Sequence, residues 1–286
     1  SALMNLKYTL LLCGMCYPLP VYANPTPDCD IEKNTKITAQ APASLLPCFA
    51  SPSPAIRDDY ALTTFSHILR TGQVSEAALV SMILDIQEQL RNPRVKQYHK
   101  AFLTLGLAEI ARVDRITPFL NESQRKALVG TAIFLFKTTT DFTGFDDKYG
   151  YIHQIPHTAD LVLQLALNEC ISQHQLIALA QSLKTVINPS QVVFYHTNEP
   201  DRLARASIYL FLRKELSEAF ITQWLEDVSL PPNGSWEAAY QSKKGLAAMH
   251  NVKGFLGRLL LTSYDKQNER IALVHAHALT QLRRVR

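Results

Sequence analysis

The sequence predicts an all-α fold. Apolar residues recur at helical spacing along most of the chain after Asp58, and nearly every break between such segments contains Pro, Gly, Asn or Ser. No segment alternates between apolar and polar residues long enough to indicate a strand, and only residues 191–195 (QVVFY) are ambiguous. Successive helix pairs would recur roughly every 35–45 residues, which is typical of helical repeats. We therefore expect an α–α superhelix of HEAT-like repeats, with a compact multi-helix bundle as the alternative.

Each expected helix has its own apolar period, and several have a start signal. Ser75 is a good N-cap, and Asn121 with Gln124 comes close to a capping box. The expected helices cover residues 60–69, 75–90, 100–115, 121–139, 158–170, 172–187, 201–215, 217–228, 245–264 and 268–285.

Length and composition indicate a globular protein. The chain has 286 residues, of which 47% are hydrophobic and 19% charged. We expect a signal peptide at residues 1–23, a Pro-rich extended leader at 24–57, and a single helical-repeat domain at 58–286. The formal net charge of +4 is small and does not favour a nucleic-acid partner.

The first residues resemble an export signal. Lys7 precedes a short apolar run (residues 8–16), and Val21-Tyr22-Ala23 fits the small-residue rule for cleavage. The alternative, a membrane anchor, needs about 20 apolar residues. We therefore expect cleavage near Ala23, a periplasmic or secreted protein, and no stable membrane insertion.

The three cysteines outside that segment are expected to form one disulfide and one buried thiol. Cys29 and Cys48 flank a Pro- and Ser-rich stretch, and an oxidising compartment would let them form a disulfide. The alternative is two unpaired cysteines. Cys170 stands in an apolar helical pattern, so a buried, unreactive thiol is expected there.

The strongest candidate for a site is the stretch GYIHQIPHTADL, residues 150–161. Proline is tolerated only in the first turn of a helix, so Pro156 predicts a helix start near residues 153–155. His157 and Asp160 then lie on one face, with His153 at the helix start. The positive end of the helix dipole should keep both imidazoles neutral.

Three interpretations of this stretch stay open. His153, His157 and Asp160 could supply part of the ligand shell of a divalent metal. They could form a polar site without a metal, or they could be structural. The spacing is not that of the H-E-x-x-H zinc proteases.

Two other polar groups are candidates for the same pocket. Glu199, Asp201 and Arg202 crowd the start of a helix, where acids also simply complement the helix dipole. Asn251 interrupts an apolar helix, and a buried Asn must find partners, so it either braces a loop or joins a site. Equivalent helices of neighbouring repeats lie side by side, so we expect Glu199 and Arg202 near His157 and Asp160.

These segments resemble the three signatures of an uncharacterised bacterial family, domain-of-unknown-function family 2785, over roughly residues 60–265. The family pattern falls on Asp147, Gly150, Tyr151, His153, His157 and Asp160, on Glu199, Asp201, Arg202 and Leu203, and on Asn251, Phe255, Leu256 and Arg258. Tyr149, Tyr151 and Pro156 depart from the usual Arg, Trp and small residue. The resemblance implies an α-helical, HEAT-like fold and brings no established activity.

Two functions of different classes remain. The first is a binding or scaffold protein whose concave face holds a polar pocket for an unknown small molecule or protein. The pocket residues would be His153, His157, Asp160, Asp147, Tyr151, Glu199, Asp201, Arg202 and Asn251. The second is a metal-assisted or His/Asp acid–base hydrolase that uses the same pocket, with a divalent metal as its cofactor. No Gly-rich phosphate loop and no recognisable Ser or Cys nucleophile motif favours another enzyme class.

Overall fold

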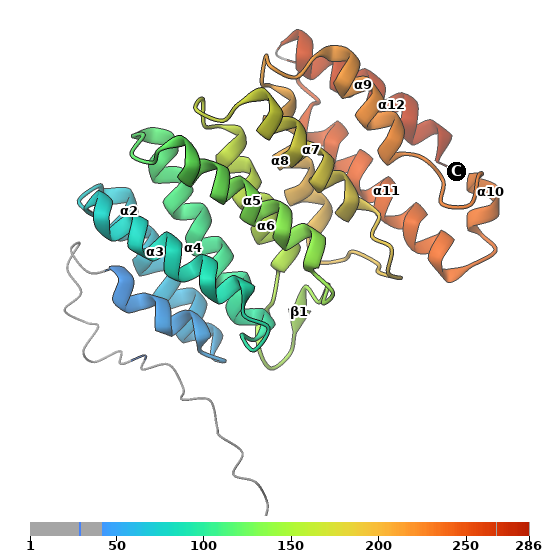
Figure 1. The fold of residues 1–286 in the computed structure, drawn as a ribbon. Coiled ribbons are helices and arrows are strands. Elements are labelled where there is room, and N and C mark those ends of the chain that lie inside the picture. The colour runs from blue at the N-terminus through green and yellow to red at the C-terminus, as the bar shows by residue number, and fades with distance from the viewer. Residues whose placement is uncertain (1–28, 30–41, 267, 286) are drawn as a thin grey trace, which may run out of the picture.

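The protein is all-α, as the sequence predicts. The computed structural model describes residues 29, 42–266 and 268–285, and these residues are mostly helical, as Figure 1 shows. The expected signal peptide (residues 1–23) and most of the expected leader lie outside the described residues. Among the described helices, none is long and apolar enough to cross a bilayer.

The elements follow one another with short connections. In chain order they are the 3₁₀ helix η1 (Pro42–Ala50), the π-helix η2 (Ala55–Leu62), α2 (Thr63–Thr71), α3 (Glu76–Arg91), α4 (Gln97–Ile116), α5 (Glu122–Thr138), β1 (Phe145–Asp146), β2 (Gly150–Tyr151), α6 (Gln154–Ala166), α7 (Gln173–Ile187), α8 (Glu199–Phe211), α9 (Glu218–Val228), α10 (Trp236–Ala239), α11 (Lys243–Thr262) and α12 (Glu269–Arg284).

Capping side chains set the starts of several helices. Ser75 Oγ accepts a hydrogen bond from Ala78 N at the start of α3. Asn121 and Gln124 form a complete capping box at the start of α5. α6 begins at Gln154 with His153 as its N-cap residue, so the start predicted from Pro156 is confirmed.

The described part of the expected leader is helical, not extended. η1 contains Pro47, yet Leu45, Leu46 and Phe49 are buried in the core. Burial of these apolar side chains stabilises the helix despite its prolines, which no local propensity could predict. The boundary of the domain itself stays a prediction.

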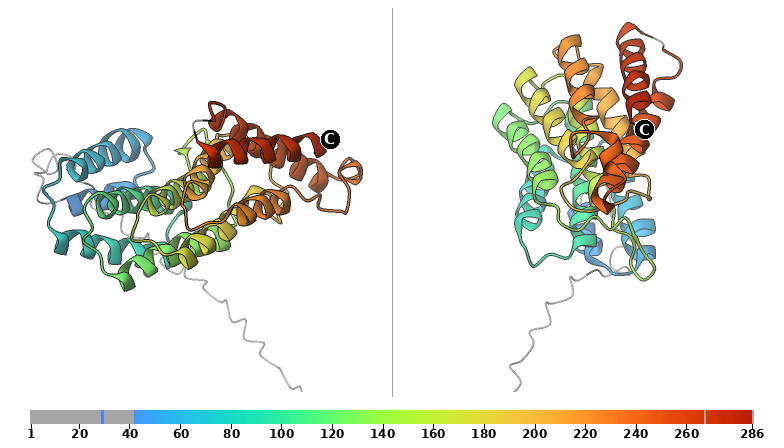
Figure 2. Two further views of the ribbon diagram at one scale, coloured as in Figure 1. Left: turned by 90° about the horizontal axis from the view of Figure 1, so that it is seen from above. Right: turned by 90° about the vertical axis from the view of Figure 1, so that its right-hand side faces the viewer.

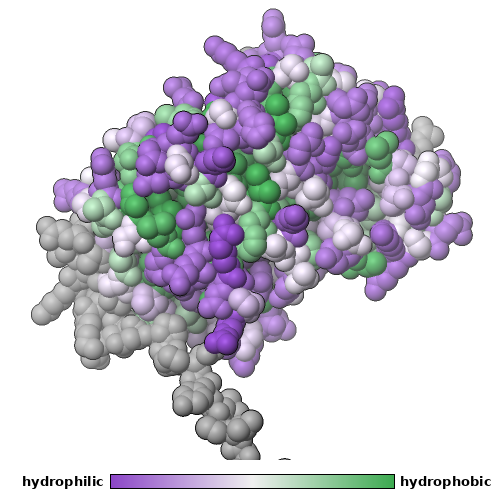
Figure 3. Space-filling model, viewed as in Figure 1, coloured by the Kyte–Doolittle hydropathy of each residue, from purple (hydrophilic) through white to green (hydrophobic). Residues whose placement is uncertain are grey.

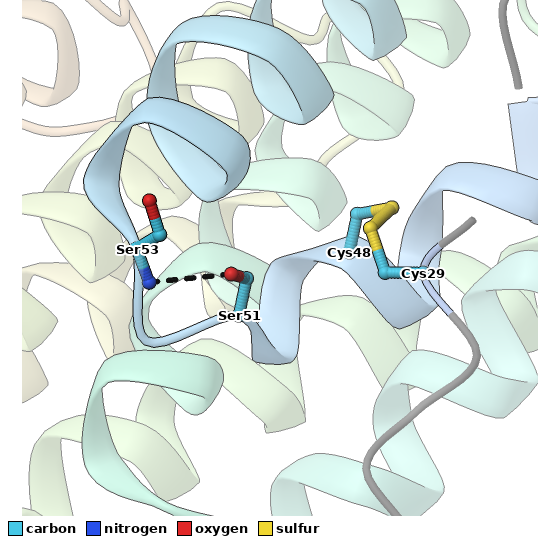
Figure 4. The surroundings of a disulfide bond; sticks show 4 residues. All are labelled: Cys29, Cys48, Ser51 and Ser53. Atoms are coloured by element: carbon cyan, nitrogen blue, oxygen red, sulfur yellow. Dashed lines mark hydrogen bonds between the residues drawn. A yellow bond between two sulfur atoms is a disulfide. The ribbon is translucent and has the colours of Figure 1, made fainter. Parts of the chain in front are cut away.

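Cys29 and Cys48 form the predicted disulfide, which joins residue 29 to η1 (Figure 4). Their Cα atoms are 4.7 Å apart. The expectation for Cys170 is wrong, because its side chain is exposed. α6 ends at Ala166, four residues before Cys170, so this cysteine lies in the following turn rather than on the buried helix face.

A small β-hairpin was not predicted. Phe145 pairs with Tyr151 and Asp146 with Gly150, in a segment whose glycines and acids indicate only a loop. Gly150 has a φ of +69° and would place a Cβ 2.9 Å from Pro54, so both its conformation and its contacts require glycine. The ambiguous residues 191–195 belong to a loop and form no strand.

The helices pack in two rows. In one row α4, α6, α8 and α11 contact one another in that order, and in the other α5 contacts α7 and α7 contacts α9. The rows join where α5 packs on α6 and α7 on α8, and α3 packs on α4. Figures 1 and 2 show this order running across the molecule from the blue end to the red end. The face seen in Figure 3 is mostly hydrophilic, with narrower apolar areas between.

Candidate functional site

A cavity of about 650 Å³ opens between α2, α4, α6 and α8. Each helix contributes residues three or four positions apart, so each presents one face. The cavity is lined by Leu62, Thr63, Ser66, His67, Arg70, Leu105, Ala108, Glu109, His157, Asp160, Leu163, Gln164, Arg202 and Arg205. Three of the residues predicted from sequence, His157, Asp160 and Arg202, thus lie around one cavity.

His157 is the buried polar group of this cavity. Its side chain is only 5% exposed, and its Nδ1 lies 2.8 Å from the carbonyl oxygen of Ala101 on α4. A carbonyl oxygen only accepts, so Nδ1 carries the proton and donates it to that oxygen. Nε2 is then a lone-pair acceptor, and Nδ1 makes the one hydrogen bond recorded for this ring among the described residues. The ring therefore offers a free acceptor where it lines the cavity.

Burial keeps this imidazole neutral. Removal from solvent lowers the pKa of His157 to about 3, and the hydrogen bond to Ala101 opposes that shift only in part. The neutral imidazole predicted from sequence is therefore present, but its main cause is burial rather than the helix dipole. Phe102 packs against the ring in an edge-to-face arrangement, with centroids 5.2 Å apart.

Asp160 and Arg202 form an ion pair between α6 and α8. The predicted proximity of the two sequence segments is thus confirmed for this pair. Burial raises the pKa of Asp160 to about 6, and the positive charges of Arg202 and Arg205 counter this only partly. The carboxyl group consequently titrates near neutral pH.

The wall of the cavity contains a second ion pair, which was not predicted from the sequence. Arg70 on α2 donates to Glu109 on α4 through Nη2 at 2.6 Å and Nε at 3.1 Å. Arg205 was missed as well. It follows Arg202 by three residues on the same helix face, so its place in the cavity could have been predicted from this spacing. Arg70 and Glu109 lie 39 residues apart and come together only by the packing of α2 on α4.

His153 lies beside this cavity, not in its wall. It is 7% exposed, and its ring centroid is 5.7 Å from that of His157. Its Nε2 is buried and has no hydrogen-bond partner in the described part of the chain. Burial lowers the pKa of His153, against the opposing charge of Glu199. Its φ of +26° is unusual for a residue with a side chain.

Glu199 holds the loop that leads into α8. Its Oε2 accepts from the backbone N of Thr197 at 2.7 Å, and its Oε1 accepts from the hydroxyl of Thr197. A Cβ at Gly144 would lie 1.6 Å from the Thr197 hydroxyl oxygen. Glycine at this position therefore lets the two loops meet next to His153.

The other candidates lie away from the cavity wall. Tyr151 is 45% exposed, with its ring centroid 4.5 Å from that of His153. Asp147 is exposed between the two hairpin strands, and Asp201 is half-buried on α8. Asn251 accepts from Tyr195 N at 3.0 Å and donates to Val193 O at 2.9 Å, so it braces a loop.

The structure does not bring the predicted metal ligands together. In the described part of the chain, no group of three His, Cys, Asp or Glu side chains could hold a metal ion. Asp160 is paired with Arg202, which occupies the carboxylate. His153, His157 and Asp160 therefore do not fit a divalent metal in this arrangement.

One comparison with known proteins gives a match. The model of a family described as "Protein of unknown function (DUF2785)" matches residues 66–261. The matched segment begins within α2 and ends within α11. It includes α6, which carries His157 and Asp160, and α8, which carries Arg202. No curated protein and no solved structure matches the chain.

Proposed function

The chain belongs to the family of proteins of unknown function DUF2785, and we propose that it is a binding protein that holds a small polar molecule in the cavity between α2, α4, α6 and α8. The observation that carries this proposal is the orientation of His157. Its ring is buried and fixed through Nδ1, while Nε2 stays unpaired at a cavity of about 650 Å³. This acceptor faces the cavity that the ring lines, so a ligand hydroxyl or amide can donate a hydrogen bond to it.

The size and the polarity of the cavity support a small ligand. Sites for small molecules commonly enclose about 300–1,000 Å³ and fix a ligand with a few placed polar groups. Here those groups are His157, Asp160 and Arg202, which come from two neighbouring helices. Helices are stiffer supports than loops, so these groups need little rearrangement on binding.

We also propose export and a HEAT-like superhelix for this binding protein. The Cys29–Cys48 disulfide is compatible with an oxidising compartment, which is what the expected signal peptide implies. The two rows of paired helices support a repeat architecture, in which the cavity would belong to the concave face.

A hydrolase remains the second candidate because of Asp160. A carboxyl group with a pKa near 6 is suited to proton transfer at neutral pH. His157 suits that role less well, because an imidazole with a pKa of about 3 is a weak proton acceptor. Acid–base chemistry by Asp160 is the form of hydrolysis to test, with nitrophenyl esters, phosphates and glycosides as probes.

A pair of substitutions at His157 tests binding. Asn places its amide at the same distance from Cβ as Nδ1, so His157→Asn can keep the hydrogen bond to Ala101 and removes Nε2. Gln reaches as far as Nε2 and removes the Nδ1 donor. Ligand-observed NMR against a library of sugars, amino acids, organic acids and amines should give ligands for the wild type. Those ligands should be lost in His157→Asn and partly retained in His157→Gln. A library without a single ligand, or ligands unaffected by His157→Asn, would refute the proposal.

A further inference from the structure

The charges that line the cavity do not balance. Its wall contains the three arginines Arg70, Arg202 and Arg205 but only the two carboxylates Glu109 and Asp160. Glu109 is engaged by Arg70 and Asp160 by Arg202. One positive charge is thus left without a carboxylate partner in the cavity wall.

That remaining charge belongs to Arg205. Its side chain is exposed on α8 and makes no hydrogen bond or ion pair within the described residues. Its charge acts on Asp160, where it opposes the rise of the carboxyl pKa that burial causes. A guanidinium binds carboxylates and phosphates through two parallel hydrogen bonds and gives up its hydration more readily than an ammonium group. Arg205 is therefore free to receive an anionic group inside the cavity opening.

His157 sets a second requirement on the same ligand. The ring is buried, and its unpaired Nε2 can only accept. An anionic group placed there would set lone pair against lone pair, so the ligand must also carry a hydrogen-bond donor. An ammonium donor would add a positive charge to a wall that already has one in excess. A hydroxyl group meets the requirement without that repulsion.

We propose that the ligand is a hydroxylated organic anion, bound by Arg205 through its anionic group and by His157 Nε2 through a hydroxyl. This inference rests on the proposed binding function and narrows it to one chemical class. A sugar acid and a sugar phosphate share this chemistry, since both combine hydroxyls with a group that a guanidinium recognises. In both cases His157 Nε2 would accept from a hydroxyl and Arg205 would bind the anionic group.

The test uses probes that share one sugar ring and differ in charge. Isothermal titration of the full chain at pH 7 and low salt compares glucuronate, glucose 6-phosphate, glucose and glucosamine, with acetate as an anion that has no hydroxyl. One of the two sugar anions should bind at least about tenfold more tightly than the other three probes, which corresponds to about 1.4 kcal/mol. The stronger of the two anions identifies a carboxylate or a phosphate ligand.

Substitutions assign the effect to Arg205. Arg205→Gln should weaken binding of the sugar anion at least about tenfold, because it removes a charge-assisted contact, and Arg205→Lys should restore part of it. Arg94→Gln is the matched control, since Arg94 is exposed in a turn and does not line the cavity. Equal binding by Arg205→Gln and wild type, or no binding of either sugar anion, overturns the inference. If glucose or glucosamine binds best and His157→Asn abolishes it, the binding function stands and the anionic class fails.

Discussion

Nδ1 of His157 on α6 lies 2.8 Å from the carbonyl oxygen of Ala101 on α4. The two nitrogens of this ring therefore have different roles. Nδ1 joins neighbouring helices, while Nε2 stays free where the ring lines the cavity. His157 is therefore buried and held against the neighbouring helix.

The first prediction follows from this division. His157→Gln loses the donor to Ala101 and should lower the free energy of unfolding by about 1 kcal/mol more than His157→Asn does. Ala101 is within α4, so its oxygen keeps a helical partner and the cost stays at this low end. Urea denaturation of both variants measures the difference. Equal stabilities would mean that the contact does not join the helices.

The second prediction is a loss of stability in acid. Burial lowers the pKa of His157 to about 3 and that of His99 to about 4, against about 6.5 in the unfolded chain. Between pH 6.5 and 4 the unfolded state therefore binds more protons. Each of the two histidines should then reduce stability by up to about 1.4 kcal/mol per pH unit as the pH falls.

Asp160 acts in the opposite direction. Its pKa is raised to about 6 in the folded protein from 3.8, so between pH 6 and 3.8 the folded state binds more protons and gains stability as the pH falls. The destabilising effect of the two histidines is larger than the stabilising effect of one carboxyl group. We therefore expect a net loss of stability as the pH falls. In Asp160→Asn the loss should be steeper. Urea midpoints at pH 7, 6, 5 and 4.5 check both slopes, and a wild-type midpoint that rises toward pH 4.5 would contradict the prediction.

The features predictable from sequence were those with a local cause. The capping residues Ser75 and Asn121 and the first-turn Pro156 fix helix starts through contacts within a few residues. The pairing of Asp160 with Arg202 was predictable for a related reason. Helix pairs that recur at regular spacing place equivalent residues side by side, so one periodicity connects positions far apart in the chain.

The features that could not be predicted depend on packing between distant segments. The hydrogen bond of His157 requires α4 against α6, and Arg70 meets Glu109 only where α2 crosses α4. The helical form of η1 depends on burial of residues such as Phe49, in a segment whose prolines suggest an extended chain. The pairing of Asp160 with Arg202 on another helix was likewise not visible in the spacing of His153, His157 and Asp160, which alone suggested a metal site.

The third prediction concerns the pKa of Asp160. Arg202 lowers it through both its charge and its hydrogen bond, and Arg205 through its charge alone. Arg202→Gln should therefore raise this pKa above about 6, and by more than Arg205→Gln does. Carbon-detected NMR of the carboxyl group during a pH titration measures both shifts. A larger shift in Arg205→Gln would mean that the ion pair with Arg202 does not hold in solution.

The fourth prediction concerns the cysteines. Before reduction, iodoacetamide should modify Cys170, which is exposed, and leave Cys29 and Cys48 unmodified. Peptide mapping by mass spectrometry distinguishes these sites. The double variant Cys29→Ser/Cys48→Ser should lose roughly 3 kcal/mol of stability by the chain-entropy model, while Cys170→Ser is the matched control and should lose little. Alkylation of Cys29 or Cys48 in the unreduced protein would contradict the disulfide.

The last prediction concerns Arg57, whose side chain is completely buried. Its Nη2 donates to the carbonyl oxygens of Tyr149 and Tyr151 at 2.7 and 3.3 Å, and its Nε donates to Asp58 at 2.6 Å. One guanidinium thus ties η2 to the hairpin that leads into His153. Arg57→Met should lower the free energy of unfolding by at least about 2 kcal/mol, because it removes hydrogen bonds from a charged donor in a buried place.

Arg57→Lys separates geometry from charge. An ammonium group carries the same charge but cannot span Asp58 and both carbonyl oxygens from one planar group. Its loss of stability should therefore approach that of Arg57→Met. The amide of Ile152, which donates to Gly144 O at 2.9 Å, should also exchange its hydrogen faster in both variants, because the hairpin is no longer held against η2. If Arg57→Lys were as stable as the wild type, a positive charge at this position would be enough to hold η2 against the hairpin. The planar geometry of the guanidinium would then not be required.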